Sequence, residues 1–175
     1  MDGINAHWMP FTSNRDFKQS PRTIKAAEHH HYIDDNDRKI YDIFSGLWTS
    51  GVGHCHPHIV QAVQEQVATL DYAMSFQMTN NRASELAAKL TELAPANFDR
   101  CFFTNSGSEA ADTALKIALA YHQAKGQPQK QMLIGRERGY HGTNFGGISV
   151  GGIAANRNIY AGNLLPKVDH LVTTH

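Results

Sequence analysis

The chain has 175 residues, of which 41% are hydrophobic and 18% are charged. This length fits one domain, or one domain with part of a second, and the low charged fraction indicates that extra surface is buried against something else. Sixteen basic and sixteen acidic residues cancel, and no basic run is present, so nothing in the composition favours a nucleic acid or a membrane as a partner.

The two cysteines, Cys55 and Cys101, are too few for a secreted disulfide framework. A reduced, cytoplasmic protein is therefore expected. The N-terminal sequence MDGINAHWMPFTSNRD lacks the charged region and apolar stretch of a signal peptide, and no run approaches the length of a membrane-spanning helix.

Short strands are predicted within residues 23–46. They flank Asp34-Asp35-Asn36-Asp37, a sequence typical of a turn, so this part predicts a small antiparallel meander. The triplet His29-His30-His31 is expected to lie in a strand, where at most two of three side chains share a face. A glycine-rich loop follows over residues 46–57.

Helical periodicity then predicts three helices, over residues 59–70, 83–94 and 106–125, with Gly126 ending the last. Strands are expected over residues 101–104 and 131–135, which gives a βαβ unit and a mostly parallel sheet covered by helices. The remainder is expected to hold one short helix and the start of a strand near Leu171. Two short strands cannot complete a sheet, so the chain looks like the first half of an α/β domain.

The sequence FTNSGSEA, residues 103–110, lies where a strand would meet a helix. Ser106 and Glu109 have the spacing of a capping box, which requires only that a helix begins there. Gly107 would also let a ligand approach the unpaired helix amides, and the hydroxyls of Ser106 and Ser108 would bind a phosphate. The local sequence favours the cap alone, and the absence of Walker A and G-x-G-x-x-G patterns argues against a nucleotide.

A second loop, Gly139-Tyr140-His141-Gly142, follows the next predicted strand. Loops at the carboxyl ends of parallel strands line the ligand crevice, so this loop and the Ser-Gly-Ser turn are expected to lie side by side. An aromatic ring beside an anion site suits a flat phosphorylated cofactor. A surface turn is the alternative, and the residues leave both open. Trp48, on the glycine-rich loop, fits either core packing or the wall of a substrate pocket.

Two other motifs are rejected. The histidine-rich segments lack the paired ligands of a structural zinc site, so no metal is expected. Residues 147–151, GISVG, match the G-x-S-x-G nucleophile elbow, and Asp169 and His170 follow it. The preceding GYHGTNFGG cannot be a central strand, however, and two adjacent residues cannot serve as separate members of a triad.

Together, GLWTSGVGHCHP, TNSGSEA and IGRERGYHG resemble the class III, pyridoxal-phosphate-dependent aminotransferases. WMPFT, FDRCFFTNSGSEAADTALK and SVGG resemble the omega-amino acid (β-alanine):pyruvate subgroup, in order along nearly the whole chain. The resemblance implies an α/β protein of PLP fold type I, present as an N-terminal fragment with the small meander. Residues 1–55 would be the N-terminal part of the small domain and the crossing segment, and residues 56–175 the first half of the large, PLP-binding domain.

The resemblance also implies pyridoxal 5′-phosphate as the cofactor. The residues implied to bind it are Ser106, Gly107 and Ser108 at its phosphate, Tyr140 stacked on its ring, and His141 and Gly142, which complete that loop. The residues implied to line the substrate pocket are Trp48, Phe11 and Phe76.

No catalytic residue is expected in this chain. In this family the Schiff-base lysine and the carboxylate at the ring nitrogen lie downstream of the GYHG loop. None of the eight lysines of the chain stands in the matching context. The chain is therefore expected to be inactive by itself.

The parent protein is expected to be a cytoplasmic transaminase, a homodimer or a higher homo-oligomer. It would move an amino group from an omega-amino acid such as β-alanine, or from an amine, to pyruvate. The alternatives are another class III enzyme (a diamine or ornithine-type aminotransferase, a decarboxylase or an aminomutase) and a truncated, non-enzymatic chain that only pairs with a partner.

Overall fold

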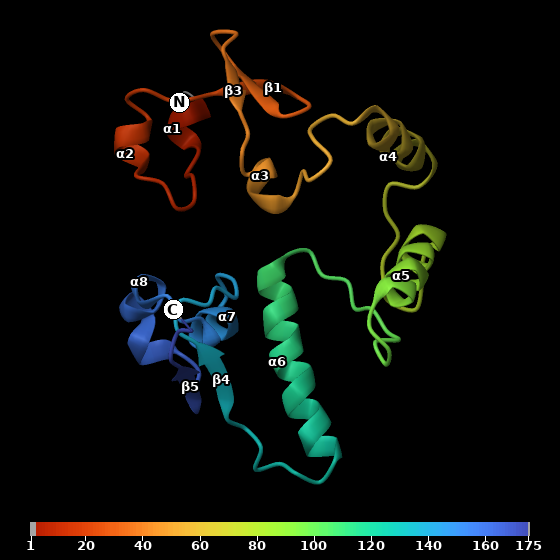
Figure 1. Cartoon of the computed structure of the whole chain (residues 1–175), viewed down its shortest axis with the longest axis vertical. Helices are drawn as coiled ribbons and strands as arrows, with labels where there is room; N and C mark the ends of the chain where they lie inside the picture. The colour runs from red at the N-terminus through yellow and green to blue at the C-terminus, as the bar shows by residue number, and fades with distance from the viewer. Residues whose placement is uncertain (1–2, 175) are drawn as a thin grey trace. The chain divides into compact units, whose positions relative to one another are not determined.

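The computed structural model describes residues 3–174, and the chain forms two compact units, Met1–Asn81 and Arg82–His175. The first unit contains α1 (Gly3–Ala6), α2 (Asn14–Phe17), β1 (Ile24–Glu28), β2 (His31–Asp34), β3 (Lys39–Tyr41), α3 (Ser45–Trp48) and α4 (Pro57–Thr69) (Figure 1). The second contains nearly all of α5 (Asn81–Leu93), followed by α6 (Gly107–Ala124), β4 (Leu133–Arg136), α7 (Phe145–Val150), α8 (Ala154–Arg157), the 3₁₀ helix η1 (Asn158–Asn163) and β5 (Val168–Leu171). The domain boundary predicted at residue 55 concerns the complete fold and stays a prediction.

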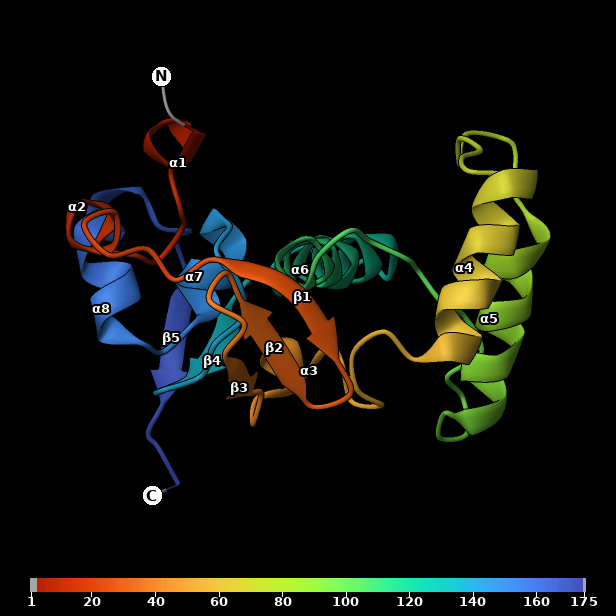
Figure 2. The ribbon, with the colours of Figure 1, turned by 90° about the horizontal axis from the view of Figure 1, so that it is seen from above.

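The first unit contains the predicted antiparallel meander. The strands lie in the order β1-β2-β3, with Tyr32 of β2 opposite Ala27 on one side and Ile40 on the other (Figure 2). The expectation that the histidine triplet lies within one strand is wrong. His29, with φ of 48°, and His30 lie in the turn between β1 and β2, and only His31 belongs to a strand. The chain must reverse there so that two short strands can pair.

The predicted turn between β2 and β3 is built around the buried carboxylate of Asp34. Its Oδ1 accepts the backbone N–H groups of Asn36 (3.0 Å) and Arg38 (2.9 Å), and its Oδ2 accepts Nε of Arg38 (2.8 Å). The backbone hydrogen bond from Arg38 is the main cause that lowers the pKa of Asp34, against the opposing effect of burial. The turn residues therefore organise the loop through one side-chain acceptor.

The three predicted long helices are confirmed as α4, α5 and α6. Helix α6 ends in a Schellman motif, because Gly126 has φ of 70° and donates to the carbonyl of Gln123 (3.1 Å), while Gln127 donates to that of His122 (2.9 Å). Helix α4 begins at Pro57, where the missing N–H of proline leaves no helix bond unmade.

The parallel pairing lies later in the chain than predicted. Residues 131–135 were expected to form a strand, and β4 occupies Leu133–Arg136, but its parallel partner is β5, with Leu133 opposite Val168. Residues 101–104 are not a strand, since they pair with no other strand among the described residues, and most of them are exposed. The observed unit is thus β4, then α7, α8 and η1, then β5.

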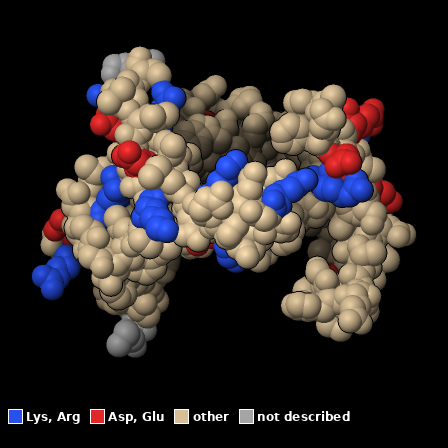
Figure 3. Space-filling model, turned by 90° about the horizontal axis from the view of Figure 1, so that it is seen from below, with Lys and Arg blue, Asp and Glu red and all other residues tan. Residues whose placement is uncertain are grey.

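Little of the apolar surface is buried within the chain. Among the described residues, Val150 is the one buried hydrophobic side chain, and Ile59, Val63 and Val67 on α4 are about half exposed. Uncharged residues make up most of the face drawn in Figure 3. Exposed apolar surface on this scale is typical of surfaces that pack against other protein. No helix between residues 3 and 174 combines the length and the apolar character needed to cross a membrane.

Candidate active site

The N-terminus of α6 is a capped helix end with two backbone donors left over. Ser106 has an extended backbone, and its Oγ accepts the N–H of Glu109 (3.1 Å), while Oε2 of Glu109 accepts the N–H of Asn105 (2.9 Å). The predicted cap is confirmed, although the return bond reaches one residue upstream of Ser106. Within the described chain, the N–H groups of Gly107 and Ser108 have no acceptor. A Cβ on Gly107 would meet nothing within 4 Å, so the helix end is open on the side of Gly107 where a side chain would lie.

The GYHG loop lies directly against this helix end, as predicted. Oγ of Ser108 accepts the backbone N–H of Thr143 (2.9 Å) and lies 3.3 Å from the Thr143 hydroxyl. Gly142 has φ of 105°, and a Cβ there would come within 2.6 Å of the Ser108 Cα, so the contact requires glycine. Because Ser108 Oγ accepts a bond from the loop, its own proton can be donated either to the Thr143 hydroxyl or to an acceptor outside the chain.

A second contact lies one helical turn further on, at Asp112. Its Oδ1 accepts the N–H of Gly147 (2.8 Å), and a Cβ on Gly146 would lie 2.4 Å from the same oxygen. Sequence reasoning missed both Asp112 and Thr143. The sequence signal that could have identified Asp112 was its spacing of four residues from Ser108, which puts both on one face of a helix.

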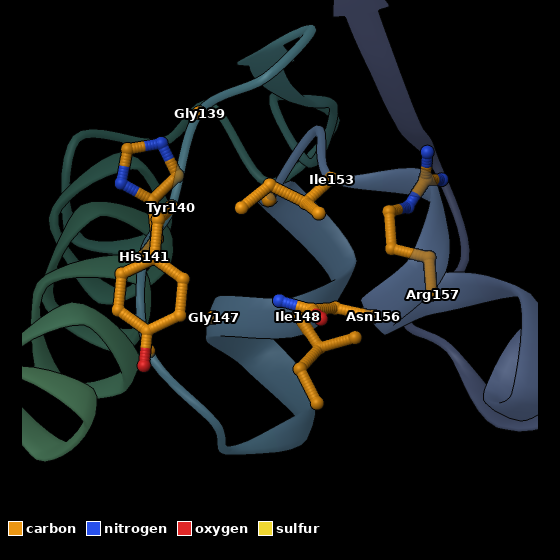
Figure 4. A pocket seen from close by; sticks show the side chains of 10 residues that line it. Gly139, Tyr140, His141, Gly147, Ile148, Ile153, Asn156 and Arg157 are labelled. Atoms are coloured by element: carbon orange, nitrogen blue, oxygen red, sulfur yellow. The ribbon is translucent and has the colours of Figure 1, made fainter. Parts of the chain in front are cut away.

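Tyr140 is 56% exposed, which leaves part of this residue accessible to a ligand. The GYHG loop also lines a cavity of about 10 Å³, which holds one water at most. Figure 4 shows the Tyr140 ring and Arg157 on opposite sides of this view, with Ile153 between them. A flat cofactor would therefore lie on the exposed face of Tyr140 and not in this cavity.

The three residues predicted to line a substrate pocket all belong to the Met1–Asn81 unit. Trp48, Phe11 and Phe76 are exposed by 82%, 84% and 81%, and no ring contact joins them in the described part of the chain. Their role as pocket walls stays a prediction.

Ser149 of the G-x-S-x-G sequence has a structural role. It lies inside α7 and is 1% exposed, and its Oγ donates to the carbonyl of Phe145 (2.5 Å) and accepts the N–H of Leu165 (2.8 Å). A nucleophile elbow would require an exposed serine between a strand and a helix. Across residues 3–174, no three His, Cys, Asp or Glu side chains gather as a metal site would require.

The capped helix end beside an aromatic loop, on an α/β scaffold, is accompanied by a match to one protein family. Residues 12–174 match the class-III aminotransferases, and the chain belongs to that family. These enzymes use pyridoxal 5′-phosphate, and the fold is PLP fold type I, so both predictions are confirmed.

The chain is 54% identical to an omega-aminotransferase of Caulobacter vibrioides, over 98% of this chain and 39% of that relative. It is 52% identical to a beta-alanine–pyruvate aminotransferase of Pseudomonas aeruginosa, over 98% of this chain and 38% of the relative. An omega transaminase of Pseudomonas jessenii, solved in complex with PMP, superposes with a TM-score of 0.93 at 32% identity, over 98% of this chain and 38% of that one. The chain thus spans about two fifths of the length of these proteins.

Proposed function

We propose that this chain supplies the phosphate site and the ring-stacking side chain for pyridoxal 5′-phosphate in a transaminase. One observation carries the proposal: the open N-terminus of α6 and the GYHG loop are joined by the bond from Thr143 N–H to Ser108 Oγ. Phosphate at a helix N-terminus is stabilised by the orphan N–H groups and by the helix dipole.

Each proposed contact with the phosphate uses a hydrogen-bond donor that the described chain leaves available. The N–H groups of Gly107 and Ser108 lack acceptors in the described chain, so they would donate to the phosphate. The hydroxyls of Ser106 and Ser108 each accept a backbone N–H, which leaves their protons for phosphate oxygens. Tyr140 would stack on the pyridine ring, and His141 and Gly142 would hold the loop beside it.

When bound, this cofactor supplies an electron-withdrawing ring that stabilises negative charge beside the amino group being transferred. The residues of this chain would bind and orient it. The lysine and the carboxylate that complete the site would lie outside this chain, while Trp48, Phe11 and Phe76 would line the substrate pocket.

We propose that the protein carrying this chain is cytoplasmic, assembles as a homodimer or larger, and transfers an amino group from an omega-amino acid such as β-alanine, or from an amine, to pyruvate. The two relatives at more than 50% identity are named for this kind of reaction, and the exposed apolar surface supports burial against other protein.

The direct test is to incubate the complete protein with pyridoxal 5′-phosphate, β-alanine and isotopically labelled pyruvate and to measure alanine that carries the label of the pyruvate. Formation of alanine is expected. Release of carbon dioxide in the absence of pyruvate would replace the proposal with a decarboxylase, and unlabelled alanine formed from the donor alone would replace it with an aminomutase.

The phosphate site has its own test. We expect Ser108→Ala to lower the affinity for pyridoxal 5′-phosphate by about tenfold to a hundredfold, since a charge-assisted hydrogen bond is lost. The affinity for pyridoxal, which lacks the phosphate, should change much less. Thr143→Ala keeps the backbone bond to Ser108 and serves as the control. Equal losses for the two ligands would contradict this assignment.

A third test concerns the chain by itself. Borohydride treatment of the 175-residue chain with pyridoxal 5′-phosphate should leave no stoichiometric adduct, because no lysine here is placed to bond the cofactor. One adduct at a single lysine would show that the chain carries the missing group.

A further inference from the structure

The turn α3 has an unusual backbone. All four of its residues, Ser45–Trp48, have φ between 49° and 70°, so they form one left-handed turn. It is closed by the N–H of Trp48 on the carbonyl of Phe44 (2.9 Å) and by that of Thr49 on Ser45 (2.9 Å). Residues other than glycine disfavour this conformation. A turn of this kind persists only where surrounding groups impose it.

The group that imposes it is the carboxylate of Asp42, whose side chain is 6% exposed. Its Oδ2 accepts the N–H of Gly46 at 2.7 Å and lies 2.7 Å from Nε2 of His54. Its Oδ1 accepts the N–H of Phe44 at 3.2 Å, and the hydroxyl of Tyr32 faces the same carboxylate, since burial and then Asp42 raise the pKa of Tyr32. One buried acceptor thus holds two loop amides and the His54 ring, with the Tyr32 hydroxyl beside it.

The two side chains tie Asp42 to the meander. Tyr32 belongs to β2, and its ring centroid lies 4.6 Å from that of His54. His54 is fixed by paired backbone bonds with His29, at 3.2 and 2.7 Å, and Asp42 itself donates its N–H to the carbonyl of His30 (2.8 Å). Through these bonds, the hairpin between β1 and β2 therefore fixes the position of the turn α3.

Trp48 is the last residue of this turn, and it is 82% exposed. In the part of the chain that the structure describes, no hydrogen bond or ring contact holds that indole, so the backbone alone sets its place. We propose that Asp42, held by Tyr32 and His54, is a positioning residue that keeps Ser45–Trp48 left-handed and thereby sets the place of the Trp48 indole. As a determinant of amino-donor size, this role rests on the proposed function, in which Trp48 walls the substrate pocket.

The first experiment uses the complete, substrate-free protein and compares Asp42→Asn with Asp35→Asn. Asp35 is an exposed carboxylate next to the meander, with no side-chain partner in the described chain, and is a matched control. We expect Asp42→Asn to raise amide hydrogen exchange at Gly46 by about tenfold or more. It should also change the fluorescence of Trp48 when the other tryptophans are replaced by phenylalanine. Exchange equal to that of Asp35→Asn would overturn the inference.

A milder variant guards against misfolding. Tyr32→Phe removes the hydroxyl beside the carboxylate and should raise exchange at Gly46 by less than Asp42→Asn does. If Tyr32→Phe leaves both exchange and fluorescence unchanged while Asp42→Asn unfolds the whole protein, Asp42 is a general stabilising residue and the inference fails.

The second experiment measures kcat and KM for a small and a bulky amino donor. Asp42→Asn should alter the ratio of the two KM values in the same direction as Trp48→Ala, with kcat for the small donor changed less than twofold. If Trp48→Ala shifts the ratio and Asp42→Asn does not, the specificity role is overturned. If Trp48→Ala has no effect, the proposed pocket wall is wrong, whereas exchange at Gly46 still decides whether Asp42 holds the turn.

Discussion

Two loops of this chain are fixed in contrasting ways. The turn that carries Trp48 is held by the carboxylate of Asp42. This carboxylate accepts hydrogen bonds from the backbone N–H groups of Phe44 and Gly46 and from the side chain of His54. The GYHG loop and the start of α7 that follows it are also held by close packing, since the backbone at Gly142, Gly146 and Gly147 approaches other atoms too closely for any side chain. The first arrangement depends on a charge, and the second depends on shape.

This difference predicts what each loop tolerates. A polar clamp weakens by degrees as donors or charge are removed, because the remaining bonds persist. A glycine contact fails abruptly, because a Cβ at 2.3–2.6 Å from a neighbouring atom forces the backbone to move.

The largest effect is expected for Gly142→Ala. The new Cβ would lie 2.6 Å from the Ser108 Cα, and φ of 105° is unfavourable for alanine, so we expect a loss of about 3 kcal/mol or more in the free energy of unfolding. Urea unfolding followed by circular dichroism measures this. A variant as stable as the wild type would mean that the loop does not pack on α6 as described.

Gly107→Ala is the matched control, because a Cβ there meets nothing within 4 Å. Its free energy of unfolding should stay unchanged or rise by up to about 1 kcal/mol, as alanine favours a helix. Its affinity for pyridoxal 5′-phosphate should nevertheless fall by about tenfold, since the methyl group occupies the proposed phosphate position. Unchanged affinity would count against that position.

The next largest effect on the free energy of unfolding is expected for substitutions at Asp112. Asp112→Ala removes the acceptor of the Gly147 N–H, and we expect about 2 kcal/mol less stability because a hydrogen bond to a charged group is lost. Asp112→Asn keeps an oxygen in place and should lose about half as much. Urea unfolding of the two variants gives the comparison, and equal stability of all three proteins would show that glycine packing alone holds the loop.

A smaller effect is expected for Ser106→Ala. The substitution removes the cap on the N–H of Glu109, which is worth about 1 kcal/mol. Ser106→Thr retains the hydroxyl and should behave like the wild type. The free energy of unfolding is again the measure, and a loss shared by the threonine variant would mean that the cap is not the cause.

The sequence predicted these two regions unequally. The helix end at Ser106 was predictable because a cap is encoded by residues three apart. The neighbouring loop lies beside it as predicted, although the strand over residues 101–104 on which that prediction rested is not formed. The hydrogen bond between Asp112 and Gly147 joins residues that are 35 positions apart, so it can be recognised only in the folded structure. Sequence reasoning identified Gly46 to Trp48 as a candidate site but missed Asp42, because nothing in a linear pattern tells a buried carboxylate from a turn residue.

The strand predicted over residues 101–104 fails for a related reason. Apolar sequence predicts that a segment can be a strand, whereas pairing decides whether it is one. Its residues find no pairing partner in the described chain, while β4 and β5 find each other. Both the missed contacts and the wrongly predicted strand therefore depended on partners that are distant in the sequence.

The smallest and most local effect is expected at acidic pH. It should distinguish the two loops, because only the Trp48 turn is held by the carboxylate of Asp42. Burial tends to raise the pKa of Asp42, but the hydrogen bonds from His54, Gly46 and Tyr32 outweigh it and lower the pKa below the usual 3.8. The contribution of this carboxylate to stability is therefore present above pH 3.8 and is lost as the pH falls through the lower value of the folded protein. We expect the fluorescence of Trp48 to change below pH 3.8, as protonation weakens the bonds to Gly46 and Phe44. In Asp42→Asn, which has no carboxylate there to protonate, this transition should be missing. The same acid transition in that variant would show that another group controls the turn.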